Sequence, residues 1–202
     1  MKLYYSPGAC SLAPHIALKE AGIAFDAVKV DLKTKKTEAG ADYRAINAKG
    51  GVPAIEMDDG QILTEVAVVL QYIADRKPEA KLAPAHGTLA RYRVLEWLNY
   101  IASEVHKGFG PLWNPQSSED TKSATKAALG ARFDHLSKAL EGRKFLAGDG
   151  FTIADAYLFT ILGWTEYTNI DLGKWPVLAA YVEHLGARAG VRAALLAEGL
   201  IK

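Results

Sequence analysis

The sequence is poor in cysteine, in long apolar runs and in net charge. It has one cysteine in 202 residues, which excludes an internal disulfide bond but leaves a mixed disulfide with a small thiol possible. No apolar run approaches the ~20 residues that cross a bilayer, and no charged leader precedes an apolar segment and a cleavage site. We therefore expect a soluble, cytoplasmic protein without a membrane partner.

The charges of the chain nearly cancel. It carries 24 Lys and Arg against 23 Asp and Glu, a formal net charge of +1. A chain without a basic excess has no general attraction for nucleic acid, so a nucleic-acid partner is disfavoured. The hydrophobic content of 50% is ample for a core, and the length suits one large domain or two small ones.

The first part of the chain alternates between strand and helix patterns. Residues 2–5 predict a short strand, and Ser11 is a candidate cap of a helix that ends at Gly22. Residues 25–32 alternate as a second strand, and residues 42–46 suit one or two helical turns. With the hairpin and helix described next, the order β-α-β-α-β-β-α predicts a mixed sheet of four strands, the first two parallel.

The stretch of residues 50–66 organises this part of the chain. A Gly-Gly pair before Val52-Pro53 suits a sharp turn into a strand, and Asp-Asp-Gly then predicts a hairpin. A helix begins at Glu65, where free amides suit a ligand carboxylate and the Glu65 side chain suits an ammonium group. The backbone of Val52 could pair with an extended peptide. An ordinary loop and an ordinary helix start are the alternative interpretation.

The remainder of the chain has a helical pattern after a proline-containing linker at residues 77–87. Residues 152–155 resemble a capping box with Asp in place of Glu, which stabilises a helix by about 1 kcal/mol. We expect a bundle of five helices, at residues 88–109, 121–140, 152–169, 176–186 and 191–196.

Cys10 lies at the start of the first predicted helix. Unpaired amides and the helix macrodipole favour a thiolate there, although a lone cysteine is often a small buried hydrophobe. Tyr5 and Ser11 add two hydroxyl groups near the same loop, and Tyr5 is equally suited to be a strand aromatic with a solvated tip. Lys35, in a polar loop, is a candidate partner for a ligand carboxylate.

His106 differs from the other four histidines in its predicted surroundings. At 100° per residue, Asn99, Ser103 and His106 share one narrow arc of a long helix. A polar arc on an otherwise apolar helix indicates a ligand or a wet interface. Glu104 projects from another side, which suits either a contact across a subunit boundary or an interhelical hydrogen-bond network.

Four aromatic residues have helical spacing. Phe109 and Trp113 are four residues apart, and Tyr157 and Trp164 are seven apart. Such a pattern is typical of a core, and a hydrophobic substrate wall is the alternative.

Several of these residues belong to short motifs spread over the whole chain. The motifs are Tyr5, residues 7–11 (PGACS), residues 49–53 (KGGVP), Thr64-Glu65, residues 97–101 (WLNYI), residues 106–109 (HKGF) and residues 151–155 (FTIAD). Together they resemble the motifs of bacterial beta-class glutathione S-transferases. The resemblance implies a homodimer with a thioredoxin-like glutathione-binding domain over residues 1–80. It further implies an all-helical domain over residues 87–202 that carries a hydrophobic substrate site.

The resemblance also implies how glutathione, the co-substrate, is bound. Pro53 would follow a cis peptide bond, and Val52 would pair with the cysteinyl backbone of glutathione. Glu65 and the amide of Val66 would take the γ-glutamyl end, and Lys35 the glycine carboxylate. Many related transferases have serine at the position of Val66, so one hydroxyl hydrogen bond, worth about 1 kcal/mol, is expected to be absent.

Two residues are implied near the reacting sulfur, and no metal is implied. Cys10 would approach the glutathione sulfur and be able to form a mixed disulfide with it, while His106 would hydrogen-bond nearby. The residues that complete the site, some of them from the partner subunit, would be Asn99, Ser103, Glu104 and Val105.

The leading functional hypothesis is an enzyme that conjugates the thiolate of glutathione to small hydrophobic electrophiles. Two alternatives use the same scaffold. Cys10 as a nucleophile would support thiol-disulfide exchange or peroxide reduction. A non-catalytic ligand-binding or chaperone-like protein is the third hypothesis, because a fold alone does not fix a function.

Overall fold

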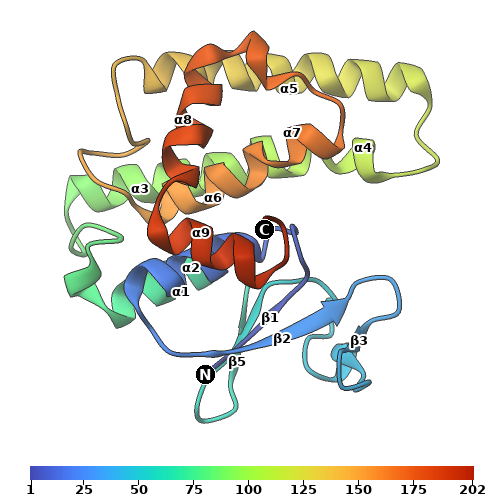
Figure 1. Cartoon of the computed structure of the whole chain (residues 1–202), viewed down its shortest axis with the longest axis vertical. Helices are drawn as coiled ribbons and strands as arrows, with labels where there is room; N and C mark the ends of the chain where they lie inside the picture. The colour runs from blue at the N-terminus through green and yellow to red at the C-terminus, as the bar shows by residue number, and fades with distance from the viewer. The chain divides into compact units, whose positions relative to one another are not determined.

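The computed structural model describes residues 1–202, which form two compact units. The first unit comprises Met1–Ala83 and Arg188–Lys202, and the second comprises Pro84–Ala187. The chain thus leaves the first unit inside the expected linker at residues 77–87. The expectation of one continuous domain over residues 87–202 needs correction. Helix α9 (Ala189–Ala197) belongs to the first unit, because it packs against α1 (Leu12–Ala21) (Figure 1).

A mixed sheet of five strands forms the first unit, in the order β3-β2-β1-β4-β5. As predicted, β1 and β2 are parallel, and β4 and β5 form an antiparallel hairpin; β1 also pairs antiparallel with β4. The sequence predicted four strands. The additional strand β3 has only two residues, and its pairing with β2 gives no local alternation to detect. The strands are β1 (Lys2–Tyr5), β2 (Asp26–Asp31), β3 (Lys36–Thr37), β4 (Ala54–Glu56) and β5 (Ile62–Thr64).

Three helices of the first unit pack together: α1, α2 (Val66–Arg76) and α9. Figure 1 shows them on the same side of the sheet. Helix α1 is buried on nearly every side because it lies between the other helices and the sheet, so that Ile16 and Leu18 are inaccessible to solvent. Two short 3-10 helices, η1 (Tyr43–Ala45) and η2 (Pro78–Ala80), complete the unit; η1 accounts for the helical turn expected at residues 42–46.

Polar contacts hold the segment of residues 188–198 against the rest of this unit. Glu198, just after α9, accepts a hydrogen bond from the backbone N–H of Gly8 at 2.9 Å. Its other carboxylate oxygen lies 2.9 Å from Nδ1 of His15, and both side chains are buried. Arg188 and Glu20 form an ion pair at 2.6 Å. The C-terminal segment is therefore tied both to α1 and to the loop before it.

The second unit is helical. The helix expected at residues 88–109 is α3 (Leu89–Tyr100) followed by a π-helical segment, η3 (Ile101–His106). The helix expected at residues 152–169 is divided at Gly163 into α6 (Ile153–Leu162) and α7 (Trp164–Tyr167). The other elements are α4 (Gly110–Trp113), α5 (Glu119–Leu140), η4 (Leu172–Lys174) and α8 (Pro176–Gly186).

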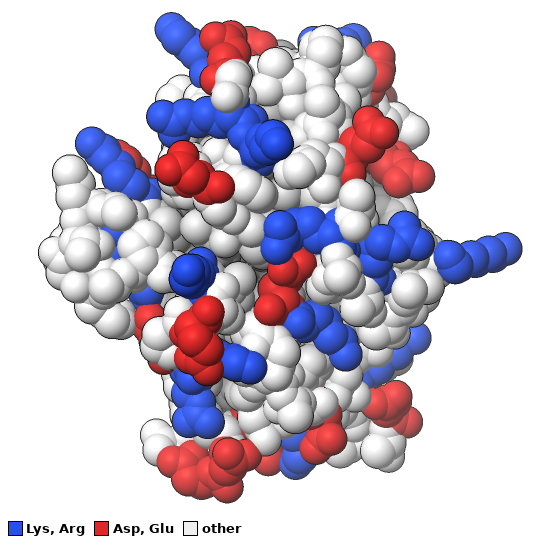
Figure 2. All heavy atoms as spheres, turned by 60° about the vertical axis from the view of Figure 1, so that its left-hand side comes forward, with Lys and Arg blue, Asp and Glu red and all other residues white.

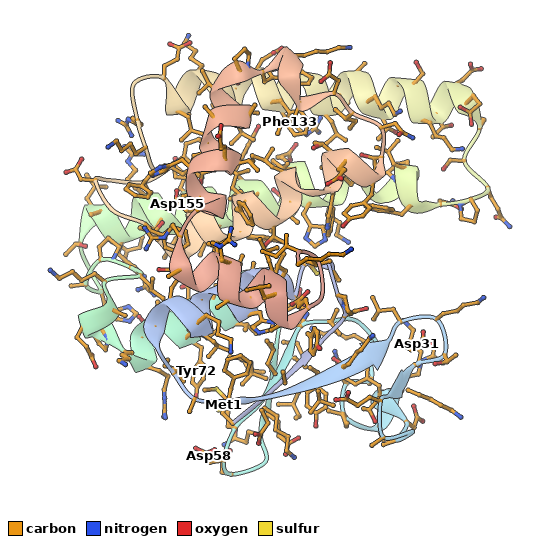
Figure 3. All side chains as sticks on the ribbon, viewed as in Figure 1. Met1, Asp31, Asp58, Tyr72, Phe133 and Asp155 are labelled. Carbon is orange, nitrogen blue, oxygen red and sulfur yellow. The ribbon has the colours of Figure 1, made fainter.

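Helix α6 is the core of the second unit, since all of its residues are buried. Its capping box at Thr152 and Asp155 is present, as predicted. The buried Asp155 carboxylate, labelled in Figure 3, accepts hydrogen bonds from the amides of Thr152 and Leu146, both at 2.7 Å. The hydroxyls of Tyr181 and Thr152 donate to the same group at 2.8 and 2.9 Å. One carboxylate thus joins α6, α8 and the loop between α5 and α6.

The surface carries both signs of charge. Figure 2 shows acidic and basic side chains interspersed over one face, without a large area of a single sign. None of the helices has both the length and the apolar character needed to span a membrane.

Candidate active site

The expected site residues fall in both units, and each group is described within its own unit. The first unit holds Tyr5, Cys10, Ser11, Lys35, Val52, Pro53, Glu65 and Val66. The second unit holds Asn99, Ser103, Glu104, Val105, His106, Phe109, Trp113, Tyr157 and Trp164.

Cys10 lies in the loop between β1 and α1 and contacts Val52, which stands two residues before the first residue of β4. Its Sγ atom is 3.1 Å from the carbonyl oxygen of Val52, to which the thiol donates. The Val52-Pro53 peptide bond is cis, as the resemblance implied. A peptide backbone paired with Val52 would therefore lie beside the only sulfhydryl group of the chain.

The protonation of Cys10 differs from the expectation. Burial raises the pKa of its thiol from 9.0 to about 12, and the nearby Glu65 carboxylate adds to this effect. The backbone amides of Cys10 and Ser11 lower the pKa, which is the helix-start effect that the sequence predicted, but burial outweighs them. Cys10 is therefore a neutral thiol at pH 7, which favours the alternative of a small buried residue over that of a thiolate.

The two hydroxyl candidates near Cys10 have structural contacts. Ser11 is fully buried, and its Oγ accepts from the amide of Ser6 at 3.1 Å and donates to the carbonyl of Ser6 at 3.3 Å. Its only hydroxyl proton thus bonds within the loop, and a catalytic role for Ser11 stays a prediction. Tyr5 packs edge-on against the ring of His15, and burial raises its pKa, so its hydroxyl stays protonated.

Glu65 stands at the junction of β5 and α2 in an uncommon backbone conformation, with φ 74° and ψ 119°. A non-glycine residue held there costs of order 1–3 kcal/mol, and such strain often occurs at functional sites. Its exposed carboxylate forms an ion pair with the ammonium group of Lys49, which also donates to Thr64 Oγ1 at 3.0 Å. The backbone bonds of α2 begin with the amide of Val68, so the amide of Val66 remains available.

Three residues support the backbone just before Val52. Lys35 donates from Nζ to the carbonyl of Gly50 at 2.8 Å. Tyr43 and Asn47 both donate to the carbonyl of Gly51, at 2.9 and 2.8 Å. Sequence reasoning missed Tyr43, Asn47 and the pairing of Lys49 with Glu65. The signal available in the sequence was an asparagine, Asn47, close to the Gly-Gly pair, since such a side chain can hydrogen-bond to nearby backbone groups.

His106 is the centre of the group in the second unit. Its Nδ1 atom lies 2.7 Å from the hydroxyl of Tyr157, and its ring meets Trp164 edge-on with centroids 4.8 Å apart. Burial, with a smaller contribution from the positive charge of Lys107, lowers the pKa of His106 from 6.5 to about 4. The imidazole is therefore neutral at pH 7.

The polar arc predicted around His106 is only partly present. The arc assumed an α-helical period, whereas η3 is π-helical and changes the direction of its side chains. Asn99 and Ser103 are exposed, and Ser103 donates to the carbonyl of Asn99 at 3.0 Å. Glu104 pairs with Arg132 of α5 at 3.0 Å, which is the interhelical alternative. Val105 is fully buried, so its side chain is a core group.

The four aromatic residues with helical spacing fit the core interpretation better than the substrate wall. Phe109 and Tyr157 are at most 1% exposed and Trp164 is 8% exposed, because their rings and neighbours pack inside the second unit. Phe109 and Trp164 meet edge-on at 5.6 Å, as do Trp113 and Trp164. Three of the four residues are therefore core groups, and only Trp113, 47% exposed, presents a large free surface that suits the alternative of a substrate wall.

Comparisons with known proteins agree with this geometry. Residues 8–76 match the profile described as glutathione S-transferase, N-terminal domain, and residues 100–189 match the corresponding C-terminal domain. Glutathione S-transferase GstA of Escherichia coli O157:H7 is 46% identical over 200 residues, which cover 99% of this chain and 100% of that protein.

Two solved structures are similar over the full length of both chains. A sphingomonad glutathione S-transferase complexed with glutathione is 50% identical, with a TM-score of 0.96 and 100% coverage of each chain. A beta-class glutathione S-transferase of Sphingomonas chungbukensis is 51% identical, with a TM-score of 0.97 and the same coverage. Both domain profiles, the full-length relatives and the Cys10, Val52 and Glu65 geometry agree: the chain belongs to the glutathione S-transferase family, in its bacterial beta class.

Proposed function

We propose that this protein binds glutathione in the first unit and conjugates its sulfur to small hydrophobic electrophiles. The observation that carries the proposal is the 3.1 Å contact between Cys10 Sγ and the carbonyl oxygen of Val52. A cysteinyl residue whose backbone pairs with Val52 has its side chain within reach of Cys10. The geometry thus supports placement of the glutathione sulfur beside the sulfur of Cys10.

The ends of the tripeptide have suitable partners. The Glu65 carboxylate already holds an ammonium group, that of Lys49, and the α-ammonium of the γ-glutamyl residue would take or share this place. The free amide of Val66 suits the γ-glutamyl carboxylate. Lys35, whose Nζ lies 2.8 Å from the carbonyl of Gly50, is the proposed partner of the glycine carboxylate.

The proposed reaction is a nucleophilic substitution or addition. The glutathione thiol loses its proton to solvent, its sulfur forms a bond to the electrophilic carbon, and any leaving group departs with its electron pair. Cys10 is a neutral thiol with a pKa of about 12, and its one proton is donated to the carbonyl oxygen of Val52, so it would donate to the glutathione sulfur only after leaving that oxygen. A neutral thiol is a poor attacking group, so this state favours conjugation over thiol-disulfide exchange initiated by Cys10.

A homodimer is part of the proposal. Asn99 and Ser103 lie exposed on α3 and η3, and we propose that they contribute to the site across the subunit boundary. Trp113 offers an exposed aromatic face for a hydrophobic electrophile. We propose the cytoplasm as the place of action, because glutathione is kept reduced there.

The test is the formation of a thioether from glutathione and an aryl halide, followed by absorbance and mass spectrometry. Turnover above the uncatalysed rate supports the proposal, and its absence contradicts it. Mass spectrometry of the protein after incubation with glutathione disulfide measures exchange at Cys10 separately. A glutathione-dependent rise in melting temperature without turnover would instead support the ligand-binding alternative.

A further inference from the structure

Tyr157 is a buried titratable residue that the proposed reaction does not yet use. It lies in the middle of α6, which packs against η3, and only 1% of its surface is exposed. Its hydroxyl is 2.7 Å from Nδ1 of His106, and the two rings stand nearly perpendicular at 86°. Trp164 meets the same imidazole edge-on. His106 is thus fixed by a ring contact from α7 and a short hydrogen bond from α6.

The chemistry of the two groups decides the direction of this hydrogen bond. A neutral imidazole has one protonated nitrogen and one that accepts, and the partner of one nitrogen sets the role of the other. A phenol, with a pKa of about 10, is a better proton donor than a neutral imidazole N–H, and an imidazole nitrogen is a better acceptor than a phenol oxygen. The favourable arrangement has the Tyr157 hydroxyl donating to Nδ1 of His106.

We propose that Tyr157 is a positioning residue that holds His106 as the neutral tautomer protonated on Nε2, so that His106 presents an N–H donor on the side of its ring away from Tyr157. This inference rests on the proposed function only where its tests measure thioether formation. It excludes His106 as the base that removes the thiol proton, because the nitrogen able to accept a proton is occupied by Tyr157. The lowered pKa of His106 agrees, since a group that stays neutral over the working pH range acts as a constant donor.

The tautomer is measured directly on the ligand-free protein by nitrogen-15 NMR of the histidine side chains. The chain has five histidines, and comparison with His106→Gln assigns the signals of His106. We expect a protonated Nε2 and an unprotonated Nδ1 in the unmodified protein. A protonated Nδ1 would overturn the inference. The unmodified protein gives this answer even if a Tyr157 variant does not fold.

Tyr157→Phe tests the source of the tautomer. Removal of the hydroxyl should give a mixture of tautomers and lower kcat/KM about 10-fold, the value of one ordinary hydrogen bond. The matched control is Tyr181→Phe. Tyr181 is also a buried tyrosine of the second unit, but its hydroxyl donates to Asp155. The control variant should leave the His106 tautomer unchanged and kcat/KM within about 2-fold. Equal effects of the two substitutions would refute a specific role for Tyr157.

Substitutions of His106 separate a donor from a base. His106→Gln keeps an N–H group near the position of Nε2 but has no basic nitrogen, so it should retain activity within about 10-fold of the unmodified enzyme. His106→Leu has no donor and should lose about 100-fold. In the Gln background, Tyr157→Phe should cause no further loss, because no tautomer remains to be set. Equal activities of the Gln and Leu variants would contradict the donor role.

The outcomes also separate this inference from the proposed function. If no thioether forms with the unmodified protein, the proposed function fails, while the NMR result still decides which nitrogen of His106 is protonated. If thioether forms and Nδ1 carries the proton, the proposed function stands and the role given to Tyr157 is wrong.

Discussion

The neutral state of Cys10 predicts how slowly this residue reacts with an alkylating reagent. Its pKa of about 12, against an ordinary 9.0, lowers the thiolate fraction at pH 7 about 1000-fold. The intrinsic nucleophilicity of a thiolate rises with its pKa, with a Brønsted coefficient of about 0.4–0.5, which recovers about 15- to 30-fold. Folded Cys10 should therefore react with iodoacetamide about 30- to 60-fold more slowly than the same residue in the unfolded chain.

The assay is the rate of alkylation at a series of pH values, measured by mass spectrometry of the intact protein. The chain has no second cysteine, so each added group reports Cys10. The same protein unfolded in urea is the reference. Its rate should level off above pH 9, whereas the rate for folded Cys10 should continue to rise about tenfold per pH unit. Alkylation of the folded protein at pH 7 as fast as that of the reference, or faster, would refute the reasoning from burial.

The same pKa has a consequence for stability. A group whose folded pKa is raised contributes stability that is fully present below the unfolded pKa and is lost as the pH rises towards the folded pKa. For Cys10 the loss should occur between pH 9 and about 12, by about 1.4 kcal/mol per pH unit. Cys10→Ala should remove this part of the pH dependence of urea unfolding.

Three further predictions concern other groups. Glu65→Gln should raise the KM for glutathione about 10- to 100-fold, because it removes a charge-assisted hydrogen bond. The control is Glu119→Gln, which alters another exposed glutamate paired with a lysine and should leave the KM unchanged. Asp155→Ala should lower the free energy of unfolding, measured by urea titration, by about 3–5 kcal/mol, because four hydrogen-bond donors lose a buried carboxylate. The control is Asp149→Ala at an exposed position, which should change the free energy of unfolding by less than about 0.5 kcal/mol. Because the pKa of His106 is lowered in the folded protein, the free energy of unfolding should fall by about 1.4 kcal/mol per pH unit as the pH falls from 6.5 to about 4. His106→Gln should abolish that loss. If urea titrations show the same pH dependence for the unmodified protein and the Gln variant, the burial of a neutral imidazole is contradicted.

Local sequence patterns were sufficient to predict the hairpin and the parallel strand pair of the first unit. Alternation and an Asp-Asp-Gly turn are enough to specify the β4-β5 hairpin, and the crossover rule specifies parallel pairing of β1 and β2. Strand β3 could not be predicted, because two residues carry no periodicity and their pairing depends on the position of β2. Likewise, residues 188–202 look like any other helical segment, and only tertiary packing assigns them to the first unit.

The candidate site divides in the same way. The sequence predicts that Cys10 lies at the start of a helix. It does not predict the charge state of the thiol, because the burial of Cys10 depends on distant segments such as the one that carries Val52. The contact between His106 and Tyr157 joins residues 51 positions apart, and no local spacing indicates it. The π-helical period of η3 points its side chains in other directions than the α-helical period of 100° per residue predicts.

The return of the C-terminal segment to the first unit affects how the chain matures on the ribosome. The loop that carries Cys10 is held by a hydrogen bond from Gly8 to Glu198, a residue that is translated after the whole second unit. At about 5–20 residues per second, the roughly 100 residues of the second unit delay that partner by about 5 to 20 seconds. During this interval the nascent first unit exposes the side of α1 that α9 later covers, so the second unit can finish folding before the first.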